Sequence, residues 1–309
     1  MSADKKDKKT GGENAAENLN RGDSVKITRE YFDSLLLEMR LIDSDIPALD
    51  YELFGYTFAS PVMTAALSHL DNTHPGGMTE LARGAAAANA VMWAGMGDGD
   101  ELESIIATGA KTIKIIKPYA DENLIMKKIE HAENCGAIAV GMDLDHAFSR
   151  NGGYDNVHGY EMRPKTQADL RRYVRSTGLP FIIKGVLSAQ DAEKCMEADI
   201  AGIVVSHHHG ILEYAVPPLM VLPEITDVIQ GQIPIFLDCA VERGYDVFKA
   251  IALGANAVSV GRALMGPLAA EGAAGVKKAI EAINAELAFV MAMTGSADFS
   301  SIDPDVVWS

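Results

Sequence analysis

Three consecutive histidines, His207, His208 and His209, follow a run of apolar and β-branched residues in the segment GIVVSHHHG, residues 202–210. Such a run predicts a buried strand of a parallel sheet. Titratable groups directly after a buried strand are typical of the catalytic face of an α/β barrel, and a histidine there can exchange a proton near neutral pH. Alternation along the strand predicts that His208 faces away from its two neighbours, so the three rings cannot all bind one metal ion.

Polar residues also follow several other candidate strands. Because the carboxyl ends of barrel strands meet on one face, we expect these side chains to gather there. A single strand-end carboxylate or amine could equally well cap the next helix, but polar groups at six strand ends together favour a site. They are Lys114 and Lys117, then Asp143, Asp145 and His146, then Lys184, then Ser206 with the histidines, then Asp238, and finally Gly261 with Arg262.

Eight short β-branched runs alternate with amphipathic helical patterns, which predicts a single TIM (β/α)8 barrel of the α/β class and not an open doubly wound sheet. Gly254 is a plausible stop for the helix after the seventh run. The connection between the fourth run and its helix, residues 144–165, is long enough to predict a lid or substrate loop. The predicted strands are 61–67, 90–95, 112–117, 137–143, 180–185, 202–208, 234–239 and 257–262.

The composition narrows the classes of protein that this chain can belong to. Residues 1–23 contain almost no apolar side chains and predict a disordered tail, so that residues 24–309 form one barrel domain with a lead-in segment. No apolar run is long enough for a membrane span or a signal peptide, and we therefore expect a cytoplasmic protein. The net charge of -16 argues against a nucleic-acid partner. Three scattered cysteines predict neither disulfides nor a metal site.

The loops after the seventh and eighth strands predict a phosphate-binding site. Cys239, Ala240 and Gly261 are small residues whose backbone N–H groups an anion could approach, and Arg262 supplies a cation. The alternative is that these small residues only allow helices to pack close to the sheet. We favour phosphate binding, because loops at this place commonly build such a site in barrels.

Several segments together resemble the FMN-dependent α-hydroxy-acid oxidases and dehydrogenases, the family of glycolate and lactate oxidase. The similarity runs from about Arg40 to the C-terminus. It rests on FGYTFASPVMTAAL (54–67) with His74 and Pro75 downstream, FIIKGVLSAQDA (181–192), GIVVSHHHG (202–210), PIFLDCAVERGYDVFKAIALGANAVSVGRAL (234–264) and ELAFVMAMTGSADFSSIDPD (286–305).

The resemblance implies FMN over the barrel mouth and a set of residues around it. Lys184 would lie beside the N1 and O2 edge of the flavin, where a cation stabilises reduced flavin. His208 matches the family's catalytic base, and Asp143 matches the carboxylate paired with it. The implied cofactor contacts are Ala65, Ala66 and Leu67 against the ring system, with Lys114, Lys184, Ser206, Asp238, Cys239, Ala240, Gly261 and Arg262.

The sequence departs from the family pattern where the family binds the substrate's carboxylate. An arginine three residues after the histidine is Ile211, and a tyrosine at the end of the third strand aligns with Ile116. Arg150 matches a second family arginine by counting, and is a candidate catalytic residue. Glu242 stands in place of a phosphate-binding arginine, and Lys114 in place of a flavin-binding glutamine. Because isoleucine cannot form a bidentate bond to a carboxylate, we expect a larger, less acidic or aromatic hydroxylated substrate.

The main hypothesis is an FMN-dependent oxidoreductase that acts on a hydroxylated small molecule, such as a non-standard 2-hydroxy acid, without a catalytic metal. Two alternatives remain open. One is an aldolase- or lyase-like barrel that uses a divalent metal among Asp143, Asp145, His146 and His208, or Lys184 as a Schiff base. The other is a flavin-binding protein without catalysis. The resemblance also implies a homo-oligomer, a tetramer, because the family commonly assembles in this way.

Overall fold

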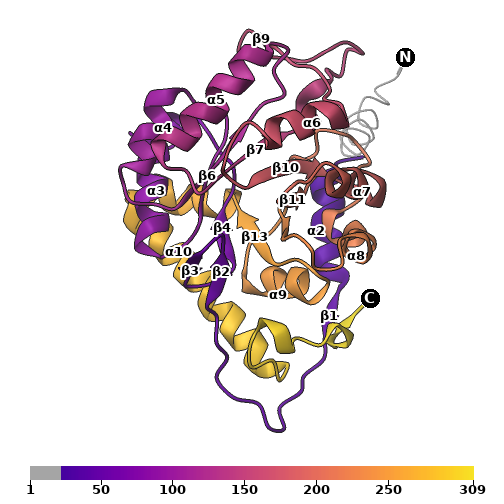
Figure 1. Ribbon diagram of the computed structural model, residues 1–309. Helices are drawn as coiled ribbons and strands as arrows, with labels where there is room; N and C mark the ends of the chain where they lie inside the picture. The colour runs from indigo at the N-terminus through magenta and orange to yellow at the C-terminus, as the bar shows by residue number, and fades with distance from the viewer. Residues whose placement is uncertain (1–21) are drawn as a thin grey trace, which may run out of the picture.

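The computed structural model describes residues 22–309, and its centre is the predicted parallel barrel (Figure 1). Eight parallel strands form one sheet, and all eight predicted strands are confirmed. The sheet closes where Leu67 pairs with Ala94 and Gly95 N donates to Leu67 O at 2.7 Å. In sheet order the strands are β4 (Val62–Thr64), β13 (Ala257–Val260), β12 (Ile235–Leu237), β11 (Gly202–Val205), β10 (Phe181–Val186), β7 (Ala139–Asp143), β6 (Thr112–Ile116) and β5 (Met92–Ala94).

Strand side chains alternate between the barrel interior and the helix layer. Ile113 and Ile115 of β6 pack inside the barrel with Trp93 and Phe236, whereas Ile116 packs in the outer hydrophobic layer. A hairpin of β2 (Tyr51–Leu53) and β3 (Tyr56–Phe58) contributes Leu53 and Phe58 to the interior cluster. Since this apolar cluster fills the interior, the polar strand ends are left to build a site at the barrel's other end.

Helices cover the outside of the barrel (Figure 1). The helix after β12 ends as predicted, because Gly254 has a φ of +113°, a left-handed conformation that favours glycine. The long last helix packs against α3 and α9 and is kinked at Gly272. The helices are α2 (Ser24–Ser34), α3 (Gly77–Ala87), α4 (Gly99–Ile106), α5 (Glu122–Cys135), α6 (Gln167–Val174), α7 (Ala189–Glu197), α8 (Pro218–Ile229), α9 (Gly244–Ala252) and α10 (Met265–Met293).

The lead-in segment is ordered from its first described residues. Most of the tail predicted for residues 1–23 lies outside the described residues, but Asp23 is the N-cap of α2 and accepts from Val25 N at 3.0 Å. Arg29 of α2 pairs with Asp246 at 2.8 Å and donates to Ala240 O at 2.8 Å. These bonds hold α2 against the loop that follows β12.

The remaining elements are short. The connection predicted at residues 144–165 contains a 3-10 turn, η2 (Asp145–Ala147), and a hairpin of β8 (Asn156–Val157) and β9 (Tyr160–Glu161). Near the chain ends, β1 (Leu36–Leu37) pairs with β14 (Val307–Trp308). In residues 22–309 no helix combines the length and the apolar character needed to cross a membrane.

Candidate active site

A cavity of about 920 Å³, part of it open to solvent, lies at the carboxyl ends of the barrel strands. Most of its walls come from the loops after β4, β11, β12 and β13, and α2 contributes Val25. The lining residues are Val25, Ala65, Ala66, Leu67, Lys184, His208, His209, Asp238, Cys239, Ala240, Val241, Glu242, Ser259, Gly261 and Arg262.

The wall formed by β4, β12 and β13 consists of small side chains and exposed backbone. A Cβ added to Gly261 would lie 3.2 Å from the Ala65 side chain, so a larger residue would narrow the cavity. Cys239 and Ala240 both have a positive φ, 74° and 57°. Left-handed non-glycine residues cost about 1 to 3 kcal/mol each and are concentrated at functional sites. Arg262 begins η3 (Arg262–Leu264) and is exposed at the rim.

Lys184 is the centre of a buried charge network at the bottom of the cavity. Its Nζ lies 3.4 Å from Asp143 and 3.4 Å from Asp238, and it contacts Ser206 Oγ at 3.3 Å. Burial alone would lower the pKa of Lys184, but Asp238 and Asp143 outweigh it and raise that pKa. Burial likewise opposes ionisation of Asp143, yet Lys184 and Lys117 hold its pKa below the usual range. The site therefore keeps both charges.

His208 is half-buried in the wall, and a carboxylate orients it. Its Nδ1 lies 2.7 Å from Asp145 Oδ1 but 3.7 Å from Asp143 Oδ1. Lys184 Nζ is also 3.3 Å from Nδ1, but the contact with the carboxylate is the shorter one. Because a carboxylate can only accept, we assign the proton to Nδ1, which leaves Nε2 as a proton acceptor. His208 N also donates to Ser206 Oγ at 3.0 Å, which fixes the backbone at this residue.

His146 of η2 faces the acceptor nitrogen of His208. The two Nε2 atoms are 3.2 Å apart, and the rings meet edge to face with centroids 4.4 Å apart. His146 Nδ1 lies 3.3 Å from Asp155 Oδ2. Burial, followed by the charges of Lys117 and His208, lowers the pKa of His146. Since each Nδ1 faces a carboxylate, the short contact between the Nε2 atoms is a hydrogen bond only when one of them carries an additional proton.

The backbone after β11 turns sharply, so the strand-alternation prediction is wrong for His209, which lies on the same side as His208. The strand ends at Val205, and His208 and His209 have positive φ values of 46° and 57°. Both therefore line the cavity. His207 is buried, accepts from Gly210 N at 3.0 Å through Nδ1, and contacts Thr28 of α2 at 2.7 Å.

The amino-acid sequence and the fold both match known flavin-dependent proteins. Residues 13–176 and 165–309 match the family described as FMN-dependent dehydrogenase. The chain belongs to this family. Spinach (Spinacia oleracea) glycolate oxidase is 30% identical over 89% of this chain and 84% of the relative. A peroxisomal (S)-2-hydroxy-acid oxidase of rice (Oryza sativa subsp. japonica) is 30% identical over 85% of this chain and 81% of the relative.

Solved structures of the same family share the fold. Mandelate oxidase superposes with a TM-score of 0.82 at 27% identity, covering 93% of this chain and 90% of that one. A mandelate oxidase variant with an FMN adduct has a TM-score of 0.84 at 26% identity, covering 97% of this chain and 96% of that one. The protein is thus an FMN-dependent oxidoreductase with a TIM-barrel fold. These findings support the flavin hypothesis and not the lyase alternative.

The residues around the cavity fit FMN. Ala65, Ala66 and Gly261 leave room for a flat ring system, and the buried ammonium of Lys184 can stabilise negative charge on it. Arg262 at the rim offers a cation to a phosphate. Glu242 also lies on the rim, where it is exposed, and its backbone N–H donates to Asp246 at 3.0 Å. Most of the cofactor contacts implied by the resemblance therefore line this one cavity.

Three predicted residues lie elsewhere. Lys114 is on the outer face of β6, where its Nζ donates to Gly95 O at 2.5 Å and where burial lowers its pKa to about 8. The structure does not support it as a flavin contact. Ile116 also faces outward, and the inward residue at this strand end is Lys117, 2.7 Å from Asp143. Arg150 is exposed, donates to Gly210 O at 3.2 Å and lies 3.7 Å from Glu213.

Sequence reasoning underestimated two groups. Lys117 received no role, although the alternation Ile113, Ile115, Lys117 indicates an inward side chain. Asp145 and His146 were expected near the site but received a role only in the metal-dependent alternative, although they contact His208 more closely than Asp143 does. The signal for Asp145 was weak, because it lies in a turn after β7 where no periodic pattern tells the direction of a side chain.

Proposed function

We propose that this oxidoreductase oxidises a hydroxylated substrate to the carbonyl compound at the barrel mouth, with His208 as the base. The reverse reduction would use the same groups. When bound, FMN supplies the acceptor for the substrate's electrons. The observation that carries the proposal is the geometry of His208 in the cavity wall, where Asp145 holds Nδ1 at 2.7 Å and Nε2, 3.2 Å from His146 Nε2, is left as a proton acceptor. That arrangement leaves Nε2 ready to take a proton from a substrate hydroxyl or α-carbon.

His146 extends the proposed proton path. When His208 accepts a proton at Nε2, that proton can form a hydrogen bond to Nε2 of His146, because the two nitrogens are 3.2 Å apart. Asp145 and Asp155 face the two Nδ1 positions. His146 is therefore a positioning residue that stabilises protonated His208, and His146→Gln should lower kcat and shift its pH profile. An unchanged pH profile would remove this role.

The charges around the cavity support a substrate that needs no carboxylate clamp. Lys117 is paired with Asp143, and Lys184 lies between Asp143 and Asp238. Arg150 is 70% exposed and lies near Glu213. Each of these cations already has a carboxylate close by, so an additional buried carboxylate on the substrate would gain little. We therefore propose a larger, less acidic or aromatic hydroxylated substrate. The reason is that the cations near the cavity are already paired, and not that Ile116 lines the cavity, as was expected from the sequence.

Anaerobic mixing of the oxidised enzyme with candidate substrates tests this proposal through bleaching of the flavin absorbance. Mandelate and its neutral amide form a matched pair, because both carry the same ring and hydroxyl. We expect the amide to bleach the flavin at least as fast as mandelate, and glycolate and lactate to react slowly. Rapid bleaching by glycolate or lactate that survives in Arg150→Ala would contradict the substrate proposal but leave the oxidoreductase function intact.

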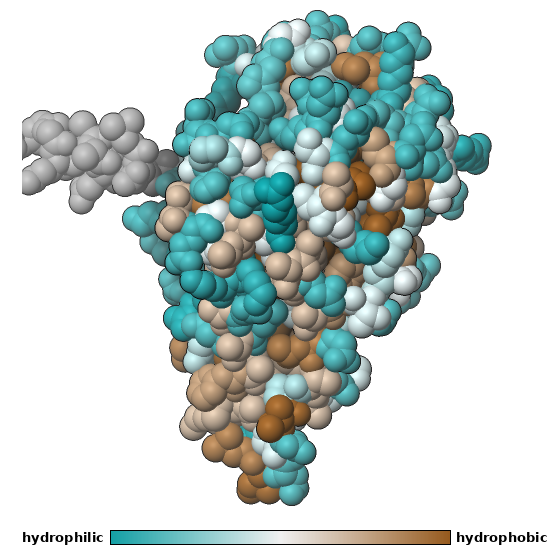
Figure 2. Space-filling view, turned by 90° about the vertical axis from the view of Figure 1, so that its left-hand side faces the viewer, coloured by the Kyte–Doolittle hydropathy of each residue, from teal (hydrophilic) through white to brown (hydrophobic). Residues whose placement is uncertain are grey.

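We further propose that the protein is a homo-oligomer, with a tetramer as the expected state. Apolar surface gathers at the narrow end of the molecule (Figure 2), where Figure 1 places the connection between β1 and β2. Ile42 and Ile46 of this connection are 92% and 89% exposed, and Met39 is 67% exposed. Contiguous exposed apolar surface is typical of contact sites. Light scattering that reports a 33.0 kDa particle at micromolar concentration would contradict an oligomer.

The cellular location stays a prediction. We propose the cytoplasm, whereas the rice relative named above is peroxisomal. Fluorescence microscopy of the tagged full chain in its own cells would distinguish the two.

A further inference from the structure

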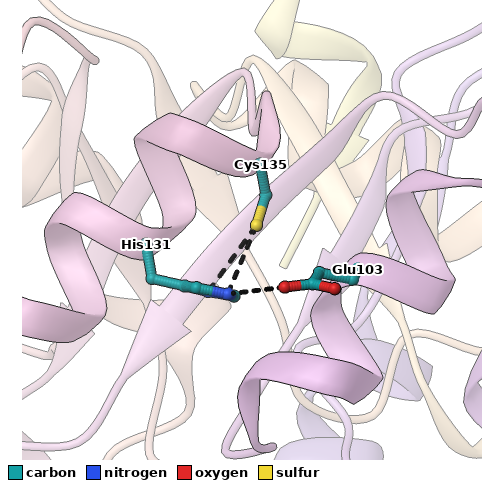
Figure 3. A group of neighbouring side chains, drawn as sticks. All are labelled: Glu103, His131 and Cys135. Carbon is teal, nitrogen blue, oxygen red and sulfur yellow. Dashed lines mark hydrogen bonds and ion pairs between the residues drawn. The ribbon is translucent and has the colours of Figure 1, made fainter.

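A cluster of three potential metal ligands lies outside the barrel, on two neighbouring helices. His131 and Cys135 are one turn apart on α5, and Glu103 of α4 points toward them (Figure 3). Cys135 Sγ lies 3.4 Å from His131 Nε2, and this same nitrogen lies 3.2 Å from Glu103 Oε1. The nitrogen is thus next to both the sulfur and the carboxylate oxygen, and the three ligand atoms lie within 4.8 Å of one another. The sulfur is also 3.7 Å from Nδ1 and so faces the imidazole ring, which has to rotate for Nε2 to point at an ion beside the sulfur.

Two of the separations are close to the edges of a tetrahedral zinc site. With Zn–S near 2.3 Å and Zn–N and Zn–O near 2.0 Å, tetrahedral angles place sulfur about 3.5 Å from nitrogen and nitrogen about 3.3 Å from oxygen. The observed separations are 3.4 and 3.2 Å. We propose that Glu103, His131 and Cys135 bind one zinc ion, with water as the fourth ligand.

The surroundings of the cluster leave room for an ion. The Glu103 side chain is 62% exposed and that of His131 is 35% exposed, so an ion and a water ligand can reach them. A Cβ added to Gly99 would lie 3.1 Å from His131 Nε2, and glycine at this position keeps the space beside that nitrogen open. Cys135 is the last residue of α5, and Gly136 follows in a left-handed cap.

The donor set selects the class of metal. A thiolate, an imidazole and a carboxylate suit zinc, whereas magnesium and calcium prefer oxygen ligands alone. Binding would release the thiol proton, because the thiolate is the ligand. The ion would join α4 to α5 on the outside of the barrel. Because the site is separate from the flavin cavity, the zinc proposal does not depend on the proposed function.

Zinc binding by the FMN-loaded protein tests the site. After treatment with a chelator, equilibrium dialysis with Zn²⁺ should show one zinc ion per chain that Cys135→Ser and His131→Gln each weaken by about 100-fold or more, the upper end of the range for disturbed ligand shells. Glu130→Gln is the matched control, since Glu130 is an exposed carboxylate of the same helix and makes none of these contacts. It should bind zinc as the wild type does.

Cobalt reports on the sulfur ligand directly. Co²⁺ in the wild-type site should give a thiolate charge-transfer band that disappears in Cys135→Ser. Cys239 is another thiol that is not fully buried, and it lies in the flavin cavity. Retention of the band in Cys135→Ser, zinc binding unaffected by either variant, or a wild type without bound zinc would each overturn the proposal. Flavin content measured in parallel verifies that the variants are folded.

Discussion

The two sides of the cavity are lined by different kinds of residue. The flavin side, which follows β4, β12 and β13, consists mainly of small residues and backbone, with Arg262 and Glu242 exposed at the rim and one buried carboxylate, Asp238, that pairs with Lys184. The proton side, which follows β6, β7, β10 and β11, consists of charged or titratable side chains that contact one another. The flavin side comprises Ala65, Ala66, Leu67, Asp238, Cys239, Ala240, Glu242, Gly261 and Arg262, and the proton side Lys117, Asp143, Asp145, His146, Lys184 and His208.

The difference shows how each side responds to change. On the flavin side a substitution alters the shape of the cavity or removes one contact, and the charges of the neighbouring residues do not change. On the proton side each charge is maintained by the others, since Lys184 keeps Asp143 ionised and Asp143 raises the pKa of Lys184 in return. Removing one member leaves a buried partner uncompensated, which costs more than the lost contact itself.

His208→Ala should have the largest effect on the reaction. Loss of the proposed base should lower kcat by about 10² to 10⁴-fold, the usual contribution of general-base catalysis. Flavin should remain bound, because most of the expected cofactor contacts lie on the other side of the cavity. Stopped-flow reduction and flavin content measured on the same preparation separate the two effects. Loss of flavin in proportion to activity would show that the two sides are not independent.

Asp143→Asn should mainly lower stability, whereas Asp145→Asn should mainly lower the rate of the reaction. Asp143 is buried between Lys117 and Lys184, so neutralising it should lower the free energy of unfolding by about 3 to 5 kcal/mol. Asp145 holds Nδ1 of His208, and Asp145→Asn should lower kcat by about 10²-fold with a smaller loss of stability. Urea unfolding and turnover of both variants provide the test. The reverse pattern would show that Asp143, as the resemblance implied, is the carboxylate that pairs with His208.

Arg262→Ala tests the flavin side. We expect weaker FMN binding by about 1.5 to 3 kcal/mol, the range for a hydrogen bond to a charged group. Titration of the apoprotein, followed by flavin fluorescence, measures the dissociation constant. Since Glu242 lies on the same rim, Glu242→Gln is the companion variant and should bind FMN at least as tightly as the wild type. Full affinity in Arg262→Ala would remove the phosphate assignment.

His207 should make stability depend on pH. Burial lowers the pKa of His207, and its Nδ1 accepts from Gly210 N, a bond that protonation would break. In the unfolded chain a histidine takes up a proton near pH 6.5, so the unfolded state binds more protons below that pH. The free energy of unfolding should therefore decrease as the pH falls below about 6.5. His207→Asn should flatten this slope in urea titrations, whereas the exposed His158→Gln should not.

Arg150→Ala should have the smallest effect. Arg150 is exposed and lies 3.7 Å from Glu213, and exposed pairs contribute about 0 to 1 kcal/mol. Turnover and KM for the neutral mandelate amide should change less than about threefold. A large rise of KM that is confined to carboxylate substrates would show that Arg150 moves inward to bind them.

The barrel was predictable because its signals are local. Each of the eight β-branched runs became a strand, and Gly254 ended its helix, since side-chain pattern and backbone preference act within a few residues. The flavin side followed for the same reason, because small residues at strand ends can be located by counting. Lys114 and Ile116 could not be placed by counting, because a shift of one position along a strand reverses the face on which every residue lies.

The sequence alone determined the fold, the family resemblance and the residues from which a site could be assembled. Only the tertiary structure decided which of them act together. Two consecutive left-handed residues turn His208 toward Asp145 and His146, and α2 buries His207 from a distance of 179 positions along the chain. Such partners depend on how separate strands and turns meet in space, and electrostatic coupling between buried charges depends on distances of a few ångströms that no sequence pattern encodes.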